Sequence, residues 1–283
     1  MKIQVYNHLH NGDIFFSRGL LKLLSQKYEV IMYHNNNTPL FSDLSYVEEI
    51  KGIPSEFLPE TDSSQIAHSG VINAWIGQGG LHYHSRPPCG CTFENYFEII
   101  KDVARYLNLN LSNIEDYLPE VNFNKVGNYD VISSKMNHLK LKYKKIILIS
   151  NGDVMSEQSS NFDFTDIVDE LSKKYHDYLF LLTKNTYLLK ENVIYTEDIT
   201  QILPDLLQIS LISLFCDVII GRDSGPYCFT HVKDNILNPN KKYICFSGNR
   251  QSGIFYSNSK VDFTWSNNYN LNDIKNIIDN KIS

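Results

Sequence analysis

The sequence predicts an α/β fold made of two doubly wound, Rossmann-like domains. Strand-like and helix-like segments alternate along both halves of the chain, which is typical of parallel sheets covered by helices. The chain of 283 residues is longer than one hydrophobic core comfortably serves, which favours two units of about 130 to 150 residues. A single large domain is the alternative. The composition, 42% hydrophobic and 20% charged, is that of an ordered globular protein.

The first half of the chain opens with a strand, a helix and a second strand. Apolar residues in the helix recur at helical spacing, whereas the strands are short apolar runs. Strands are predicted at 2–6, 29–33 and 71–76, and helices at 14–27, around 41–50 and at 92–107. This order predicts a parallel sheet in the first domain.

The second half repeats the alternation. Strands are predicted at 145–149, 178–182, 193–195, 218–220 and 242–246, and helices at 164–174, 203–215 and 271–282. Between the halves, residues 108–137 are polar and rich in asparagine, and Pro119 and Gly127 interrupt them. We therefore place the boundary between 125 and 142, and divide the chain into domains 1–135 and 136–283.

Charge and composition exclude several classes of protein. The net charge of −6 and a pI near 5.8 provide no basic field for a phosphate backbone, so no nucleic-acid partner is expected. No apolar run approaches the roughly 20 residues of a membrane span, and the first residues lack the apolar core of a secretory signal. The five cysteines lie mostly in apolar strings, as in a reducing compartment. A cytoplasmic protein is expected, and any membrane contact should be peripheral.

A short polar turn follows the first predicted strand. It contains Asn11, Gly12 and Asp13, and the carboxyl ends of parallel strands form the usual ligand edge of open α/β sheets. Asp13 could act there as a general base that accepts a proton from an attacking hydroxyl. Capping of the following helix by Asp13 is an equally good interpretation.

A second turn, Gly221-Arg222-Asp223-Ser224-Gly225-Pro226, follows the apolar strand at 218–220. Gly225 permits close backbone approach, and Pro226 suits a first helical turn. The exposed N–H groups of such a turn can hold a diphosphate, and Arg222 could add a charge-assisted contact. An ordinary strand-to-helix turn with a Ser or Asp cap has the same composition.

The two turns together resemble the heptosyltransferase-like family, glycosyltransferase family 9, which has the GT-B fold. The order of elements from Lys145 to Gly225 is also similar to that family's C-terminal domain. The resemblance implies two Rossmann-like domains facing a central cleft, with Asp13 as the catalytic base and Gly12 beside the acceptor. It also implies that Asp223, Ser224, Gly225 and Pro226 bind the donor sugar and its diphosphate.

The resemblance further implies the reaction and the partners. Domain 1–135 would bind the acceptor and domain 136–283 the nucleotide sugar. The expected activity is an inverting, metal-independent transfer, without a cofactor, to a hydroxyl of a surface-glycan or glycolipid acceptor at the inner face of the membrane. Asn151 stands where the family often has a basic residue, and Tyr227 to His231 replace its usual continuation. A non-catalytic binding protein of the same fold and an unrelated enzyme such as an epimerase are therefore alternatives.

Two further positions fall at the predicted strand ends of the second domain. Asn151 follows the strand at 145–149 and Lys184 the strand at 178–182, so both are expected to reach the donor. A solvated loop lysine is the alternative for Lys184. Glu197 and Asp198 could bond a ribose, and capping by Asp198 is the other interpretation.

The segment from His82 to Cys91 combines imidazoles and thiols in one loop. It contains His82, His84, Arg86, Cys89 and Cys91. These ligand types suit zinc, but His-x-His and Cys-x-Cys gaps differ from the usual zinc spacings, so no metal is expected. We predict instead that His82, His84 and Arg86 contact the acceptor, and a purely structural loop is the alternative. No phosphate-binding loop, dinucleotide fingerprint, nucleophile elbow or Asp-x-Asp motif occurs.

Overall fold

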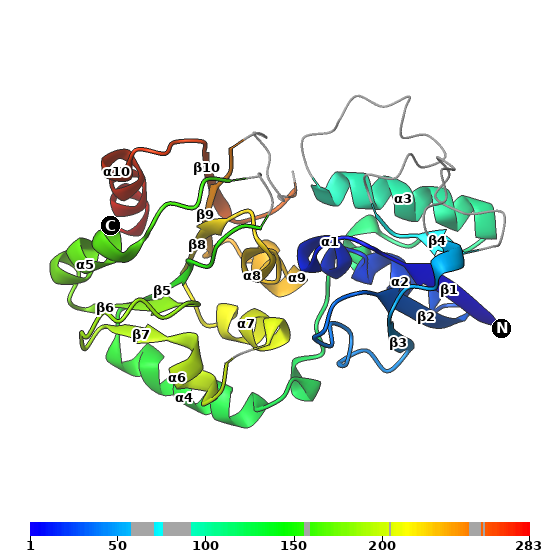
Figure 1. Ribbon diagram of the computed structural model, residues 1–283, viewed down its shortest axis with the longest axis horizontal. Coiled ribbons are helices and arrows are strands. Elements are labelled where there is room, and N and C mark those ends of the chain that lie inside the picture. Colours follow the sequence, from blue (N-terminus) through cyan, green and yellow to red (C-terminus); the bar gives the residue numbers. More distant parts are fainter. Residues whose placement is uncertain (58–70, 76–91, 156–158, 204, 249–255, 257) are drawn as a thin grey trace. The chain divides into compact units, whose positions relative to one another are not determined.

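The protein consists of two compact α/β units (Figure 1). The computed structural model describes residues 1–57, 71–75, 92–155, 159–203, 205–248, 256 and 258–283. Unit 1 comprises Met1–Lys125 and Ile254–Ser257, and unit 2 comprises Val126–Gly253 and Asn258–Ser283. The division lies earlier than the expected 135/136, which falls inside a helix of unit 2 (α4, Tyr129–Lys142).

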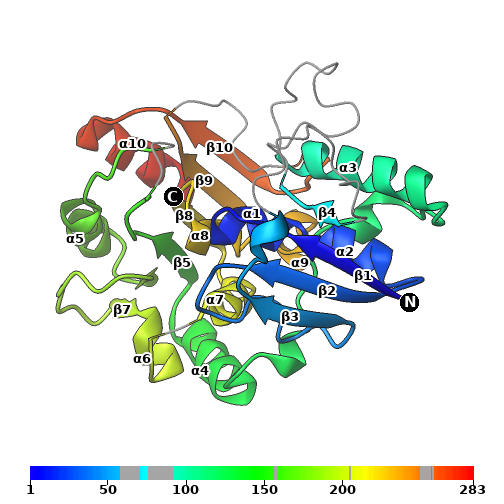
Figure 2. The same ribbon diagram turned by 45° about the vertical axis from the view of Figure 1, so that its right-hand side comes forward.

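Unit 1 is built on a parallel sheet with the strand order β3-β2-β1-β4. The strands are β1 (Lys2–Tyr6), β2 (Glu29–His34), β3 (Val47–Lys51) and β4 (Ile72–Asn73). Figure 2 shows β1, β2 and β3 side by side. The strands expected at 2–6, 29–33 and 71–76 are confirmed, although β4 is shorter.

The helix expected around 41–50 is wrong. Leu40, Phe41 and Leu44 have helical spacing but are buried in a loop, and the residues after them pair with β2 as β3, from Val47 to Lys51. Strand pairing thus overrides the local periodicity, because it satisfies the backbone hydrogen bonds of this stretch.

The helices of unit 1 are α1 (Asn11–Phe16), α2 (Arg18–Leu24) and α3 (Thr92–Leu107), with single 3-10 turns at Ser55–Phe57, Ile114–Tyr117 and Phe123–Lys125. The helix at 92–107 is confirmed, whereas the one expected over 14–27 is two helices that meet at Ser17. The hydroxyl of Ser17 donates to the carbonyl of Ile14. This local bond competes with the regular helical pattern.

Close packing around α2 fixes the core of unit 1. A Cβ atom at Gly19 would lie 2.0 Å from the Tyr117 carbonyl oxygen, so only glycine lets this helix approach so closely. On α3, the rings of Phe93 and Phe97 pack against Tyr256, whose hydroxyl donates to Glu115 at 3.2 Å. A residue from the end of the chain therefore completes the first unit.

Arg18 and Asp43 form a buried ion pair in unit 1. Their side chains are 1% and 0% exposed. The guanidinium of Arg18 also donates to the carbonyls of Leu40 and Glu120, both at 2.8 Å, and Asp43 accepts from the Asn122 amide at 2.8 Å. The pair thereby ties α2 to the loop before β3 and to the end of the unit.

Unit 2 is built on a six-stranded parallel sheet with the order β10-β9-β8-β5-β6-β7. The strands are β5 (Lys145–Ser150), β6 (Tyr178–Leu182), β7 (Val193–Tyr195), β8 (Val218–Arg222), β9 (Lys242–Phe246) and β10 (Asp262–Ser266). The five expected strands are confirmed. The sixth, β10, escaped notice because it is a half-exposed edge strand without a continuous apolar run.

The helices of unit 2 are α4 (Tyr129–Lys142), α5 (Thr165–Lys174), α6 (Thr196–Thr200), α7 (Leu206–Ser213), α8 (Gly225–Cys228), α9 (Lys233–Ile236) and α10 (Leu271–Ile282). The helices expected at 164–174, 203–215 and 271–282 are confirmed, with α7 shorter than expected. α4 was not expected, because it buries only Ile132 and Met136. No helix in the described ranges has the length and apolar character needed to cross a membrane.

The core of unit 2 explains why its strands read as uninterrupted apolar runs. β5, β6 and β8 are buried along nearly their whole length, as expected for parallel strands covered on both faces. α5 and α10 lie side by side, and Ile274 and Ile278 of α10 join the same core as Val168 and Leu171 of α5 (Figure 1).

Replacing Arg18 by Met should lower the free energy of unfolding of unit 1 by about 3–5 kcal/mol, because the buried charge of Asp43 would lose its partner. The chain has two tryptophans, Trp75 in unit 1 and Trp265 in unit 2. Urea unfolding of a Trp265→Phe background, followed by Trp75 fluorescence, therefore reports on unit 1 alone.

Arg105→Met is the matched control, since Arg105 pairs with Asp102 at 3.2 Å but is 72% exposed. It should change the free energy of unfolding by less than about 1 kcal/mol. Equal losses for the two variants would contradict a special role for the buried pair.

Candidate functional site

Each unit has a topological switch point beside its first strand. The strands that follow first pair on one side of that strand, and the later strands of the unit pair on its other side. In unit 2 this point lies between β5 and β8, which pair from Ile147↔Val218 to Ser150↔Gly221. In unit 1 it lies between β1 and β4. Ligands of open α/β sheets bind at the carboxyl ends of such strands, so both edges are candidate sites.

The turn after β8 leads directly into α8. Ser224 is the N-cap residue, with extended backbone angles (φ −133°, ψ 164°), and Pro226 lies in the first turn of the helix, as the sequence predicted. The hydroxyl oxygen of Ser224 is 3.5 Å from that of Ser150 at the end of β5. The Ser224 side chain makes no capping hydrogen bond, so apart from the long contact with Ser150 its hydroxyl can bond a ligand.

Gly221 is required by the packing beneath this turn. A Cβ atom there would lie 2.6 Å from the Tyr227 ring and 3.0 Å from Ser150 Cβ. The Tyr227 ring is fully buried and packs edge-on against His231, 4.8 Å between ring centroids. The residues that depart from the resembled family's pattern at 227–231 therefore serve as core under the turn.

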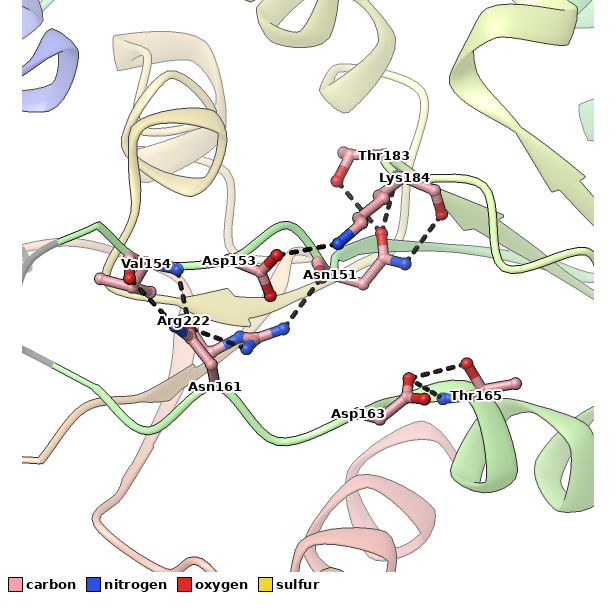
Figure 3. A network of polar contacts seen from close by, with 9 residues as sticks. All are labelled: Asn151, Asp153, Val154, Asn161, Asp163, Thr165, Thr183, Lys184 and Arg222. Carbon is pink, nitrogen blue, oxygen red and sulfur yellow. Dashed lines mark hydrogen bonds and ion pairs between the residues drawn. The ribbon is translucent and has the colours of Figure 1, made fainter.

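Arg222 is buried at the end of β8, with 1% of its surface exposed. Its two Nη atoms donate to Asn161 Oδ1 at 3.1 Å and to the Asn151 carbonyl at 2.9 Å (Figure 3). The guanidinium carbon lies 5.1 Å from the ring centroid of Phe162 and 5.3 Å from that of Phe164. Arg222 thus joins β8 to both ends of the loop that follows β5.

No carboxylate of the described residues forms an ion pair with Arg222. Its partners are a carbonyl and an amide oxygen, and its Nε atom has no hydrogen-bond partner in this part of the chain. Burial lowers the pKa of Arg222, and the carboxylates of Asp153 and Asp163 only partly offset that effect from a distance. A buried cation without a countercharge is costly.

Asn151 holds the ends of β5 and β6 together. Its amide nitrogen donates to the Lys184 carbonyl and its amide oxygen accepts from the Lys184 N–H, both at 2.8 Å. The Thr183 hydroxyl adds a longer bond at 3.3 Å. The side chain of Asn151 is therefore engaged by the protein, and its backbone carbonyl is engaged by Arg222.

Lys184 carries its charge at the exposed edge of this network. The ammonium pairs with Asp153 Oδ2 at 2.8 Å, and the two side chains are 57% and 55% exposed (Figure 3). The hydrogen bond from Lys184 is the main cause of a lowered pKa for Asp153. An exposed pair of this kind contributes little to stability, so Lys184 can exchange this partner for an anion.

Asn161 closes the loop after β5. Its side chain accepts from the Val154 N–H at 2.7 Å and donates to the Val154 carbonyl at 3.1 Å. The Ser159 hydroxyl donates to the Phe246 carbonyl at the end of β9, at 2.9 Å. Neither Asn161 nor Ser159 was singled out from the sequence. Both side chains bond backbone groups, and such bonds require no recognisable sequence motif.

The expected ribose contacts are used within the protein. The N-cap of α6 is Tyr195, so the interpretation of Asp198 as the N-cap is wrong. Asp198 is the third helical residue, and its carboxylate accepts from the Tyr195 N–H at 2.9 Å as part of a capping box. Glu197 accepts from the Asn185 amide at 2.9 Å.

In unit 1, Gly12 and Asp13 lie in the first turn of α1, after the carboxyl end of β1. The N-cap residue is His10, so the interpretation of Asp13 as the cap is wrong. The backbone carbonyl of Asp13 accepts from the Tyr96 hydroxyl. Burial raises the pKa of the Asp13 carboxyl, more than the nearby His10 and a backbone hydrogen bond lower it. A carboxyl with a raised pKa suits a general base.

The sequence did not point to the residues around this turn. Asn7 and Asn73 end neighbouring strands, and each accepts from the N–H two residues on, Leu9 at 3.1 Å and Trp75 at 3.0 Å. The His8 and Trp75 rings meet edge to face, 5.3 Å between centroids. Asn7 directly follows the strand predicted at 2–6, whereas Asn73 lies inside the strand predicted at 71–76, so only Asn7 had a positional signal in the sequence.

The expected acceptor residues His82, His84 and Arg86 lie outside the described residues, as do Cys89 and Cys91. Within the described ranges, no group of three or more potential ligands from His, Cys, Asp and Glu is placed to hold a metal ion.

Comparisons with known proteins assign the fold. No protein-family model and no curated protein matches the chain. The chain is similar to the crystal structure of a glycosyl transferase family 9 protein from Veillonella parvula DSM 2008, with 10% identity, a TM-score of 0.55, and coverage of 99% of this chain and 90% of that one. The glycotransferase of kitacinnamycin is a weaker match, with 10% identity, a TM-score of 0.44, and coverage of 100% and 90%.

The likeness to the Veillonella structure extends over nearly the whole chain, so both α/β units take part in it. The protein is therefore an α/β protein of the GT-B class, with two Rossmann-like units, as the sequence predicted. At 10% identity the likeness establishes the fold, and a fold by itself does not determine an activity.

Gly221→Ala should lower the free energy of unfolding of unit 2 by about 1–3 kcal/mol, because the new methyl group overlaps the buried Tyr227 ring. Gly152→Ala, on the neighbouring loop, meets nothing within 4 Å and should be neutral to within about 0.5 kcal/mol. Urea unfolding followed by Trp265 fluorescence in a Trp75→Phe background measures both. Equal stability of the two variants would contradict the packing described for the turn.

Proposed function

We propose that the protein is a glycosyltransferase that moves a sugar from a nucleotide-diphosphate sugar to a hydroxyl of a glycan or glycolipid. The single observation that carries the proposal is the buried guanidinium of Arg222 at the β5/β8 switch point, which forms no ion pair with a carboxylate of the described residues. The fold shared with a glycosyl transferase family 9 structure supports the reaction class.

The positive charge of Arg222 favours an anionic donor. A cation that is removed from water needs a countercharge or full hydrogen bonding, and Arg222 has neither among the described residues. A diphosphate supplies the missing negative charge and accepts charge-assisted hydrogen bonds from the remaining N–H groups. The bound anion would therefore neutralise the buried charge of Arg222 and stabilise the turn.

The residues around Arg222 complete the proposed donor site. Asp223, Ser224, Gly225 and Pro226 would hold the sugar and the diphosphate through the turn backbone and the Ser224 hydroxyl. Lys184 would leave Asp153 for a phosphate oxygen. Asn151 would act by positioning, because its amide holds Lys184 and its carbonyl holds Arg222.

Asp13 would be the catalytic base. Its carboxylate accepts the proton of the acceptor hydroxyl, whose oxygen forms a bond to the anomeric carbon as the bond from that carbon to the diphosphate breaks. Attack from the opposite side inverts the anomeric configuration. Arg222 stabilises the negative charge of the departing diphosphate, which provides a route that needs no metal or other cofactor.

In this proposal domain 1–135 binds the acceptor and domain 136–283 the donor. Gly12 lies next to the base, and His82, His84 and Arg86 remain the acceptor residues that the sequence predicts. If the acceptor is a glycolipid, the protein would work in the cytoplasm at the inner face of the membrane.

A binding protein without turnover is the second candidate. It is favoured by Asn151, an uncharged residue whose amide is fully engaged with Lys184. The two candidates differ in turnover and agree in donor binding.

Arg222 should be required for donor binding. ADP, GDP, UDP and their sugar conjugates are screened by thermal shift, and at least one nucleotide diphosphate should raise the melting temperature by mass action. Arg222→Met should weaken its binding at least about tenfold, and Arg222→Lys should retain part of it, since the charge remains. Arg105→Met, an exposed arginine of unit 1, is the control. Unchanged affinity in folded Arg222→Met would contradict the proposed donor site.

Asp13→Asn should abolish most turnover and leave donor binding intact. General base catalysis contributes roughly 10²- to 10⁴-fold to a rate, so kcat should fall by that factor. A base works deprotonated, so kcat/KM should fall as the pH drops through the pKa of Asp13, which burial raises from its ordinary value. Asp130→Asn, an exposed residue in the first turn of α4, is the matched control. Donor binding with no turnover in the wild type would favour the second candidate.

A further inference from the structure

The carboxyl end of β1 carries three buried polar atoms that have no hydrogen-bond partner among the described residues. They are Asn7 Nδ2, His8 Nδ1 and Asn11 Oδ1. Asn7 itself is 0% exposed. Buried polar groups are normally satisfied, and leaving them unpaired weakens a fold. A cluster of three at one strand end therefore indicates a place where a ligand supplies the missing bonds.

The cluster lies at the switch point of unit 1, next to an aromatic side chain. Trp75 follows β4, and its half-buried ring meets the His8 ring at 74° and 5.3 Å. β1 and β4 are neighbours in register, with Tyr6 opposite Asn73. The polar atoms after β1 and the indole after β4 thus belong to one sheet edge.

The unpaired atoms define the kind of ligand. Asn7 Nδ2 is a donor, Asn11 Oδ1 is an acceptor, and the His8 ring nitrogen can be either. A hydroxyl group both donates and accepts, so several hydroxyl groups on one ligand match this set.

The charges of the described residues at this edge disfavour an anion. Segments 7–13 and 74–75 contain no lysine or arginine, and they contain the carboxyl of Asp13. Burial lowers the pKa of His8, which therefore adds no cation at neutral pH. In unit 2 the buried Arg222 favours an anionic ligand. The edge of unit 1 therefore differs in favouring a neutral one.

We propose that this edge is a binding site for a neutral sugar, whose hydroxyls bond the unpaired polar atoms and whose ring packs on Trp75. Its meaning as the acceptor site rests on the proposed glycosyl transfer. Asn11, which would bond one of the sugar hydroxyls, precedes Asp13, the proposed base, by two residues in α1. The acceptor end would then be an uncharged sugar unit.

Trp75 fluorescence provides a direct test that needs no turnover. In a Trp265→Phe background, which removes an indole whose Nε1 is buried and unpaired among the described residues, Trp75 is the only remaining tryptophan. Methyl glucoside, galactoside and mannoside are titrated as neutral probes and methyl glucuronoside as an anionic probe, each with and without the stabilising nucleotide.

At least one neutral glycoside should change the Trp75 emission, and the glucuronoside should bind more weakly. His8→Phe keeps the ring contact and removes the nitrogens, and should weaken binding about tenfold or more. Asn7→Ala should do the same if the variant folds. Asn37→Ala, an exposed asparagine of the same unit, should change nothing.

The experiment distinguishes failure of the neutral-sugar site in unit 1 from failure of the proposed donor site in unit 2. No response to any neutral glycoside, or a stronger response to the glucuronoside, would overturn the neutral-sugar site, even where a nucleotide diphosphate still raises the melting temperature. Glycoside binding without any nucleotide effect would support the site and overturn the proposed donor binding.

Discussion

The hydrogen bonds of the buried Arg222 guanidinium are the interactions on which the β5/β8 edge of unit 2 depends. They join the end of β8 to Asn151 and Asn161, and Asn151 in turn holds Lys184 at the end of β6 (Figure 3). Three strand ends and one loop are thereby fixed around a single charge. This charge lies against two phenylalanine rings and lacks a countercharge among the described residues. A buried cation in such surroundings is costly, which is why we propose an anionic ligand at this edge.

Parallel topology brings these groups together in each unit. Both sheets reverse their strand order beside the first strand, and the loops that leave the two strands at this point diverge. In unit 2 the edge carries a buried cation, Arg222, and an exposed one, Lys184. In unit 1 it carries Asp13 and unpaired neutral groups. One architecture thus provides two edges of different chemistry, which suits an anionic donor and an uncharged hydroxyl acceptor.

Local periodicity predicted most elements because buried parallel strands are apolar along their length and the longer helices have one apolar face. It failed where a tertiary partner decided the conformation. The stretch after Leu44 became a strand because β2 offers hydrogen bonds, and β10 is recognisable only as the partner of β9. α4 has little apolar periodicity and was hidden in a polar segment.

The sequence by itself determined the α/β class and the polar segments at 11–13 and 221–226, which lie at the start of α1 and between β8 and α8, since element order and segment composition are local properties. Only the tertiary structure decided what the side chains in these turns do. It buried Arg222 against the neighbouring rings of Phe162 and Phe164 and turned Asn151 toward the Lys184 backbone. It also left Asn7 Nδ2 and His8 Nδ1 without hydrogen-bond partners among the described residues. Burial and pairing depend on segments distant in the chain, so no local pattern encodes them.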